Sequence, residues 1–552
     1  MKSTWWSITG LSLTVLVGAC STDAGSPATP GSAAGATGTG TAGSPGTAGA
    51  TGTGTAGSAG AGTGTAGATG TGTAGGPGTG TAGSPGTGTA GATGTAGAAG
   101  GGSQPLPRLV TSDPTAYWKT DGQLTEVTTG TADVTVNTTE AQTWEGFGGA
   151  FNELGWKYLM TLSQADRDAA LQLLFGDNGA RFNMGRIPMG ASDYAIARYT
   201  LDETANDTEM ASFSLAQDMM YLIPYVKAAM AVKPSIHFWA SPWTPPTWMK
   251  SSPFKAGNAV SPFDGGTMKS DDATLSAHAK YFVKFVQQYG TAGIKIEAVA
   301  PQNEPNFDQN YPSCLWATAT FVKFVGQFLG PQLMAASPDT KIMLGTMSNG
   351  DKDPAILSAV LADATAKSFV KMIGMQWGML GKESAAKASG LPMWQTEHKC
   401  GNYPWNPAGS PAYKTTAPND QAYGEESWGL IRDWIKAGVS SYSAWNMVLD
   451  PVGKGNDTTR DWAQNALLLV NGTKIVQTPT YYVFRHLSQY VEPGAKVVGT
   501  TGGDALAFKN PDGKIVTVLF NSGAAKTAIV SAGGKMFSFA LPAKGWATVT
   551  SQ

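Results

Sequence analysis

This chain of 552 residues has few histidines and a net charge close to zero. The first feature argues against a metal-binding protein and the second against a nucleic-acid-binding one. The chain has only four histidines and they lack metal-ligand spacing: His237, His278, His398 and His486. We therefore expect no metal site and no cofactor. Lys and Arg total 37 against 39 Asp and Glu, a net charge of −2, with no basic stripe suited to nucleic acid. An uncharged partner fits this charge balance better than nucleic acid does.

The apolar run near the start of the chain, at 5–17, is too short to span a bilayer comfortably. Lys2 precedes it, and Val17-Gly18-Ala19-Cys20 follows with small residues before a cysteine. This tetrapeptide resembles a bacterial lipoprotein box, which implies cleavage before Cys20 and lipidation of its sulfur. An ordinary secretory signal with an incidental cysteine is the alternative. We expect an exported protein, a cell-surface or outer-membrane lipoprotein, whose contact with a membrane is the lipid at Cys20 alone.

Residues 21–104 lack aromatic and large aliphatic side chains almost entirely and consist mainly of Gly, Thr, Ala and Ser. Such a segment cannot offset the entropy of ordering, so we expect a disordered linker. Its near-repeats carry no recurring apolar face and predict no solenoid. As a flexible coil the linker would reach about 50 Å.

From residue 142 to 480, strand-like and helix-like segments alternate eight times, which favours a closed α/β architecture, the (β/α)8 TIM barrel, over an open sheet. The predicted strands are 143–151, 181–189, 234–240, 294–300, 341–346, 372–377, 391–396 and 441–447. The predicted helices are 163–175, 214–232, 271–289, 316–336, 354–366, a short one near 382–388, and 423–437. The glycines at 146–149 lack the spacing of a dinucleotide-binding loop.

The two ends of the folded part, 105–141 and 481–552, contain short alternating apolar runs separated by Gly, Asn and Asp. This pattern predicts antiparallel strands with hairpin turns. We expect both ends to pair into one antiparallel β-sandwich beside the barrel, in a monomer.

Two of the predicted barrel strands run directly into a glutamate. Glu304 follows the strand at 294–300, between Asn303 and Pro305, and Glu397 follows the strand at 391–396. The carboxyl ends of barrel strands carry catalytic residues, and two carboxylates there suggest cleavage of a glycosidic bond. Cys314 and Cys400 follow the two glutamates at short distance, and either a disulfide between them or two free thiols would fit an exported protein.

Six ordered motifs carry a family resemblance. They are Trp144-Glu145-Gly146-Phe147-Gly148-Gly149-Ala150-Phe151, Arg186-Ile187-Pro188-Met189-Gly190, the segment 240–250 from Ala240-Ser241-Pro242-Trp243 onward, Gln302-Asn303-Glu304-Pro305, Thr396-Glu397 and Trp445-Asn446-Met447. Together they resemble glycoside hydrolase family 30, the family of glucosylceramidases and β-1,6-glucanases. The resemblance implies a (β/α)8 barrel with a β-sandwich side domain and retention of anomeric configuration.

The resemblance also implies roles for particular residues. Glu304 would be the acid/base and Glu397 the nucleophile, with Arg186 bonded to the nucleophile and Asn303 to the sugar 2-hydroxyl. We expect Asp193 to bind sugar hydroxyls through charge-assisted hydrogen bonds. Three tryptophans are expected to offer flat walls to a pyranose: Trp243, Trp377 and Trp445.

One departure concerns strand six, where many family members carry His-Trp-Tyr and this chain reads Gln376-Trp377-Gly378. The loops at 306–316 and 399–419 should form the rim of the cleft and decide specificity. A β-1,6-glucan is the favoured substrate, since a tethered enzyme meets polysaccharide more readily than sphingolipid. A glucosylceramidase-like β-glucosidase is the nearest alternative, with xylan or galactan cleavage behind it. A carbohydrate-binding protein that has lost turnover is a third reading.

Overall fold

The computed structural model describes residues 108–254, 261–399, 401–407, 410, 419–456 and 462–552. The expected signal peptide, the linker, Cys20 and Cys400 lie outside these residues. Within the described ranges, none of the helices combines the length and the apolar character needed to cross a membrane.

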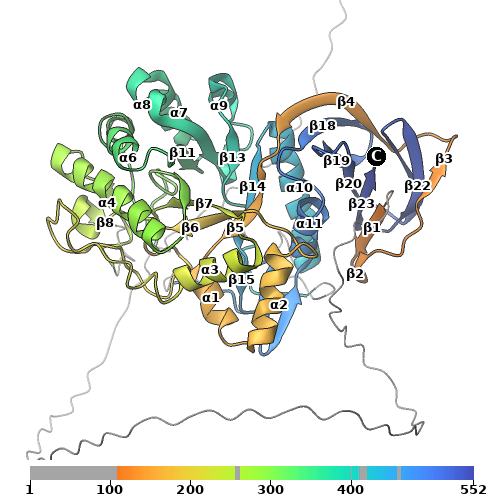
Figure 1. Ribbon diagram of the computed structural model, residues 1–552, viewed down its shortest axis with the longest axis horizontal. Coiled ribbons are helices and arrows are strands. Elements are labelled where there is room, and N and C mark those ends of the chain that lie inside the picture. Colours follow the sequence, from red (N-terminus) through yellow and green to blue (C-terminus); the bar gives the residue numbers. More distant parts are fainter. Residues whose placement is uncertain (1–107, 255–260, 400, 408–409, 411–418, 457–461) are drawn as a thin grey trace, which may run out of the picture. The chain divides into compact units, whose positions relative to one another are not determined.

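Eight parallel strands close into a barrel in the order β10-β11-β12-β13-β14-β5-β6-β7 (Figure 1). They are β5 (Gly146–Ala150), β6 (Met184–Pro188), β7 (His237–Ser241), β10 (Ile296–Val299), β11 (Lys341–Met347), β12 (Val370–Met375), β13 (Met393–Gln395) and β14 (Ser441–Asn446). Each overlaps one of the eight strands expected from the sequence, so the barrel prediction is confirmed.

The strands form because nearly every residue in them is buried, as expected where helices cover the outside of a parallel sheet. The glycines of β5 are needed because a larger side chain would not fit, and not because they bind a phosphate. A Cβ added to Gly149 would lie 2.4 Å from Cγ of Met447, so a side chain there would collide with the end of the last barrel strand.

Helices connect the strands and pack outside them (Figure 1). They are α1 (Glu153–Leu159), α2 (Gln164–Phe175), α3 (Leu222–Val232), α4 (Asp272–Thr291), α5 (Thr318–Lys323), the π-helix η2 (Phe324–Leu329), α6 (Gly330–Ala336), α7 (Asp353–Ala362), α8 (Ala364–Phe369), α9 (Ser384–Ser389), α10 (Asp420–Ala437) and α11 (Pro479–Ser488). Short 3-10 turns η1 (Thr247–Met249) and η3 (Trp377–Met379) and the hairpin β8 (Lys250–Phe254) and β9 (Gly265–Met268) lie in the loops.

Three predicted helices differ from the structure. The one expected over 354–366 is divided at Asp363, which ends α7 and caps α8 by accepting a hydrogen bond from the Ala366 N–H. The helix expected from residue 214 begins only at Leu222, because Asp218 is bonded to two tyrosines instead of continuing a helix. Its carboxylate accepts hydrogen bonds from Tyr199 at 2.8 Å and Tyr289 at 2.6 Å. The single helix expected over 316–336 is continuous from α5 to α6 but contains the π-helical turn η2.

The two ends of the folded part share one curled sheet of ten strands, ordered β2-β1-β23-β20-β19-β18-β4-β21-β22-β3. The strands are β1 (Arg108–Asp113), β2 (Ala116–Lys119), β3 (Thr125–Val127), β4 (Val134–Thr143), β18 (Lys496–Thr501), β19 (Asp504–Lys509), β20 (Ile515–Asn521), β21 (Lys526–Ala532), β22 (Lys535–Leu541) and β23 (Gly545–Ser551). The pairing of both chain ends is confirmed. The sheet is mixed rather than purely antiparallel, because β21 runs parallel to β4.

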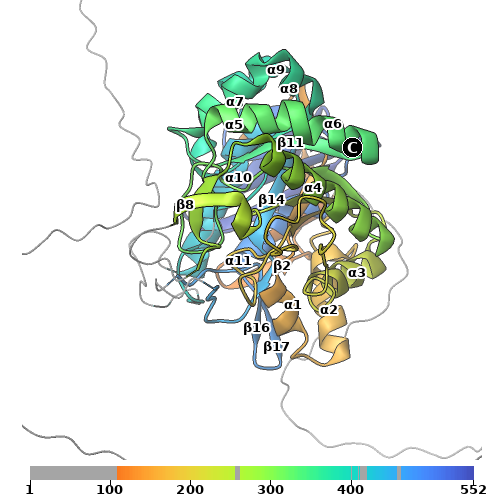
Figure 2. The same cartoon turned by 90° about the vertical axis from the view of Figure 1, so that its left-hand side faces the viewer.

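Helix α11 joins the barrel to the curled sheet, across the boundary expected at 480. His486 on α11 is hydrogen-bonded to Ser112 of β1 and Thr548 of β23, each at 2.8 Å. A smaller sheet of β15 (Val448–Leu449), β16 (Leu468–Asn471) and β17 (Lys474–Gln477) lies against α1 and α2 (Figure 2). Both ends of the folded part are thus fixed to the barrel, and the face formed by the C-terminal ends of the barrel strands is left for the site.

Candidate active site

Glu304 and Glu397 lie just beyond the C-terminal ends of β10 and β13, at the same end of the barrel. Their exposed fractions are only 8 % and 6 %. The two glutamates predicted from the sequence are thus brought to one buried site.

The backbone holds Glu304 in a conformation that L-residues rarely adopt, with φ at 51°. Its N–H donates to the Thr346 carbonyl at 3.0 Å, and the N–H of Asn303 donates to the Pro242 carbonyl at 2.8 Å. Trp377, opposite on the loop after β12, has a similar φ of 49°. Strained backbone of this kind persists where surrounding contacts fix it, and it is concentrated at functional sites.

Arg186, in the middle of β6, is buried and donates to three side chains around the pair. Its Nη1 lies 2.5 Å from Oε2 of Glu397, and its Nη2 lies 2.6 Å from Oδ1 of Asn303. The same guanidinium also contacts the Ser241 hydroxyl at 3.1 Å. The arginine predicted to bond the Glu397 carboxylate therefore does so, and it orients Asn303 as well.

The other oxygen of Glu397 accepts a hydrogen bond from the indole Nε1 of Trp377 at 2.8 Å. Trp377 was expected only to contact the sugar with its ring. Its indole N–H also donates a hydrogen bond to Glu397. Glu397 thus has the Arg186 cation and neutral donors that include Trp377, a set that favours the ionised carboxylate.

The hydrogen-bond donors to Glu304 are neutral side chains, and the sequence analysis did not predict them. The amide Nε2 of Gln376 lies 3.3 Å from its Oε1, and the hydroxyl of Tyr311 lies 3.4 Å from its Oε2. The Thr396 hydroxyl donates to Oε1 of Gln376 at 2.9 Å, which turns the amide nitrogen toward Glu304. The only sequence signal for Gln376 was that the family resemblance implies histidine at this position.

These surroundings separate the pKa values of the pair. Burial, together with the charge of Glu397, raises the pKa of Glu304 to about 8. Burial also raises the pKa of Glu397, but Arg186 and the Trp377 N–H oppose that rise. The arrangement favours a proton on Glu304 over one on Glu397, the unequal protonation that acid–nucleophile catalysis needs.

Asp193, in the loop after β6, is buried near the pair. Burial and the charge of Glu397 raise its pKa well above the usual range. Its Oδ1 has no hydrogen-bond partner among the described residues. A buried polar atom without a partner is costly, and a sugar hydroxyl would satisfy it.

Trp243 and Trp445 are more enclosed than expected. They are 2 % and 4 % exposed and stack on each other with ring centroids 5.3 Å apart. The Arg186 guanidinium lies 4.3 Å from the Trp243 centroid. One face of each ring is therefore already occupied, and what remains for a sugar is an edge or the other face.

The remaining polar candidates are structural. Cys314 is a buried free thiol, whereas Cys400 lies outside the described residues. His398 is hydrogen-bonded to Tyr442 at 2.6 Å and Ser427 at 3.0 Å. In the part of the chain that the structure describes, no group of His, Cys, Asp and Glu could hold a metal ion.

Comparison with known proteins assigns the chain to a family. The TIM-barrel domain of glycosyl hydrolase family 30 matches residues 144–491, and the beta sandwich domain of that family matches residues 494–549. The chain belongs to glycosyl hydrolase family 30. It is therefore an O-glycosyl hydrolase.

Two relatives and one solved structure illustrate the proteins to which this family 30 hydrolase is similar. Putative glucosylceramidase 4 of Caenorhabditis elegans is 30% identical over 429 residues, 72% of this chain and 79% of the relative. Endo-1,6-beta-D-glucanase neg1 of Aspergillus fumigatus is 26% identical over 409 residues, 69% and 79% of the two chains. A solved endo-beta1,6-glucanase is 26% identical with a TM-score of 0.69, covering 80% of this chain and 98% of its own.

Proposed function

We propose that the enzyme cleaves β-glucosidic linkages by double displacement, with retention of configuration. The observation that carries this is the unequal setting of the two glutamates: Glu397 has Arg186 and Trp377 as donors, and Glu304 has only neutral partners. Catalytic acids and nucleophiles of this reaction need such a difference in pKa.

In the first step the Glu304 carboxyl gives its proton to the glycosidic oxygen while the Glu397 carboxylate attacks the anomeric carbon. The leaving alcohol departs and a glycosyl ester forms on Glu397. In the second step Glu304 removes a proton from water, the water oxygen attacks the anomeric carbon, and the ester bond breaks. Asn303, fixed by Arg186, would bond the sugar 2-hydroxyl, and Asp193 would bind another hydroxyl.

We favour a β-1,6-glucan as the substrate. The similarity to the solved endo-beta1,6-glucanase supports this choice, since it extends over 98% of that chain with a TM-score of 0.69. A glucosylceramidase-like β-glucosidase is the second candidate, supported by the 30% identity with the nematode relative. The binding-only reading is weakened because Gln376 supplies Glu304 with a hydrogen bond in place of the expected histidine.

A product profile tests the substrate. The full chain is incubated with pustulan, laminarin, xylan, galactan and glucosylceramide, and released sugars are analysed by chromatography. We expect products from pustulan and little or no release from the other four. Release from glucosylceramide alone would support the second candidate, and xylan or galactan products would contradict both. Glu397→Gln should abolish all release, whereas Glu209→Gln, at an exposed residue whose carboxylate pairs with Lys280, should not.

We also propose that the enzyme is exported and tethered through a lipid on Cys20. The proposal is supported by the charged start, the short apolar run and the small residues before Cys20. The Gly/Thr/Ala-rich segment that follows would let the enzyme reach glycans away from the membrane.

A further inference from the structure

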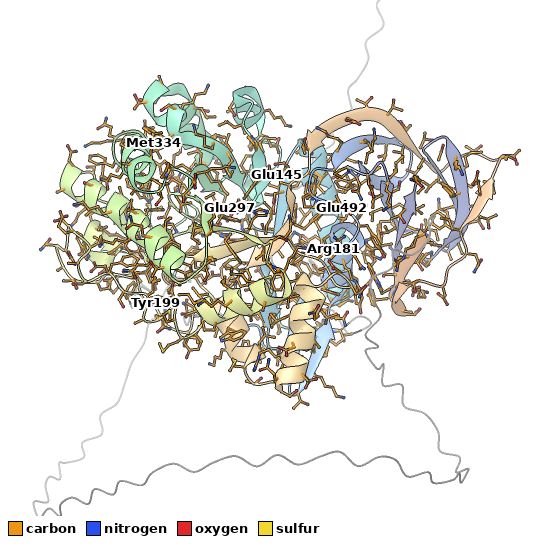
Figure 3. The ribbon with its side chains drawn as sticks, in the orientation of Figure 1. Glu145, Arg181, Tyr199, Glu297, Met334 and Glu492 are labelled. Atoms are coloured by element: carbon orange, nitrogen blue, oxygen red, sulfur yellow. The ribbon has the colours of Figure 1, made fainter. Side chains whose placement is uncertain are left out.

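The end of the barrel opposite Glu304 and Glu397 contains a second cavity, of about 320 Å³. It lies among the N-terminal ends of the barrel strands and is bordered by 143–145 and 493–494, the two segments that connect the barrel to the curled sheet. Figure 3 shows Glu145, Glu297 and Glu492 in this region, where barrel and sheet meet. Barrel interiors are normally filled by layers of side chains, so an open volume here requires an explanation.

The walls of the cavity are aromatic and apolar. Trp239, Trp394, Met184 and Met372 line it and belong to one buried cluster inside the barrel. The indole Nε1 of Trp394 donates to Oε1 of Glu145 at 2.9 Å, which fixes the ring against the wall. These side chains present rigid surfaces that suit the CH faces of a small ring.

The rim of the cavity carries both hydrogen-bond donors and acceptors. His237 Nδ1 and Glu297 Oε1 lie 2.8 Å apart, and their side chains are 51% and 38% exposed. Glu145 and Lys341 complete the rim, and Lys341 is exposed. Lys341 has no ion-pair partner within the described ranges, so its ammonium is available to a ligand. The rim thus combines two carboxylates with an ammonium and an imidazole and has little net charge.

We propose that this cavity is a second carbohydrate site, which binds one or two sugar units away from the catalytic pair. Sugar hydroxyls both donate and accept hydrogen bonds, as the mixed rim requires, and the apolar walls match the less polar faces of a pyranose. The volume is at the lower end of the ~300–1,000 Å³ typical of ligand pockets, which suits a small saccharide. The proposal goes beyond the proposed function, because hydrolysis needs only the opposite end of the barrel.

Calorimetric titration of the Glu397→Gln full chain with gentiobiose, two β-1,6-linked glucose units, tests the site. We expect two binding sites per chain. Adding Glu297→Gln or His237→Ala should weaken one of them by about tenfold, the loss expected for one hydrogen bond to a charged group. Both substitutions are at exposed side chains, and circular dichroism checks that the fold is intact. The matched control is Glu209→Gln, which breaks the exposed Lys280–Glu209 pair elsewhere and should leave both sites unchanged.

A single site in Glu397→Gln that neither rim substitution affects, or two sites that neither rim substitution affects, would overturn the proposal. The chain could instead bind tetramethylammonium, lose that binding on the rim substitutions and show no second sugar site. That result would also overturn the sugar proposal and would indicate an organic cation as the ligand of the cavity. The result is independent of the proposed catalytic roles. Turnover by Glu397→Gln would refute the nucleophile assignment, whereas the rim substitutions would still decide the second site.

Discussion

The side-chain amide of Gln376 lies 3.3 Å from Oε1 of Glu304 and is oriented by the Thr396 hydroxyl. A neutral amide thus stands where relatives were expected to carry an ionisable histidine. It can donate a hydrogen bond to the acid/base without adding a titrating group. The pH dependence of this enzyme should therefore contain no histidine titration from this position.

The first prediction concerns that pH dependence. Glu304 must be protonated to donate to the leaving group, so kcat/KM should fall as pH rises through about 8, the pKa of Glu304. At low pH the rate should fall as Glu397 becomes protonated. The measurement is a pH profile of kcat/KM with an aryl β-glucoside that has a poor leaving group. An alkaline limb that persists in Glu304→Gln, tested with an activated leaving group, would show that another residue is the acid.

The second prediction is for Gln376→Leu. The amide's hydrogen bond lowers the pKa of Glu304, so its loss should move the alkaline limb to higher pH. We expect kcat to fall by roughly tenfold, because one hydrogen bond near the reacting groups is lost. Gln332→Leu, which removes an amide bonded to Ser276 on the outer helices, is the control. An unmoved limb in Gln376→Leu would mean that the amide does not act on Glu304.

The third prediction is that Glu304→Gln stabilises the protein. The folded pKa of Glu304, about 8, lies above its value in the unfolded chain. The native state therefore holds a proton that the unfolded state releases as pH rises above ~4.3, so the carboxyl lowers stability progressively up to pH 8. Removing it should raise the free energy of unfolding at pH 8 by on the order of 5 kcal/mol, and with it Tm by several degrees. At pH 4 both should hardly change. Equal Tm values at pH 8 would argue against a buried, high-pKa carboxyl.

The fourth prediction concerns the tether. Cys20→Ala removes the sulfur that would carry the lipid, so the enzyme should move from the membrane fraction to the soluble exported fraction of a host that processes lipoproteins. Immunoblotting of fractionated cells is the measurement. A wild-type protein already in the soluble fraction would instead support the ordinary secretory signal.

The barrel could be predicted from the sequence because its strands are short, almost wholly buried apolar runs, and because a glutamate directly after a strand marks the catalytic end. The contacts that Gln376, Tyr311 and Trp377 make with the two glutamates could not be predicted, because they depend on side chains from different segments meeting in space. The predicted start of α3 was wrong for a related reason: Asp218 is hydrogen-bonded to Tyr199 and Tyr289, which lie 19 and 71 positions away in the chain. The role of Trp394 in lining the cavity at the other end of the barrel could not be predicted either, because it depends on which strands meet there.

The central claim is that Glu397 forms the bond to the sugar while Glu304 handles the proton. It is tested most directly by treating the enzyme with an activated 2-deoxy-2-fluoro-β-glucoside, which slows release of the covalent intermediate, and mapping the labelled peptide by mass spectrometry. We predict one added fluoroglucosyl group, located on Glu397. A label on Glu304, or no label together with inversion of configuration in the normal product, would contradict the account.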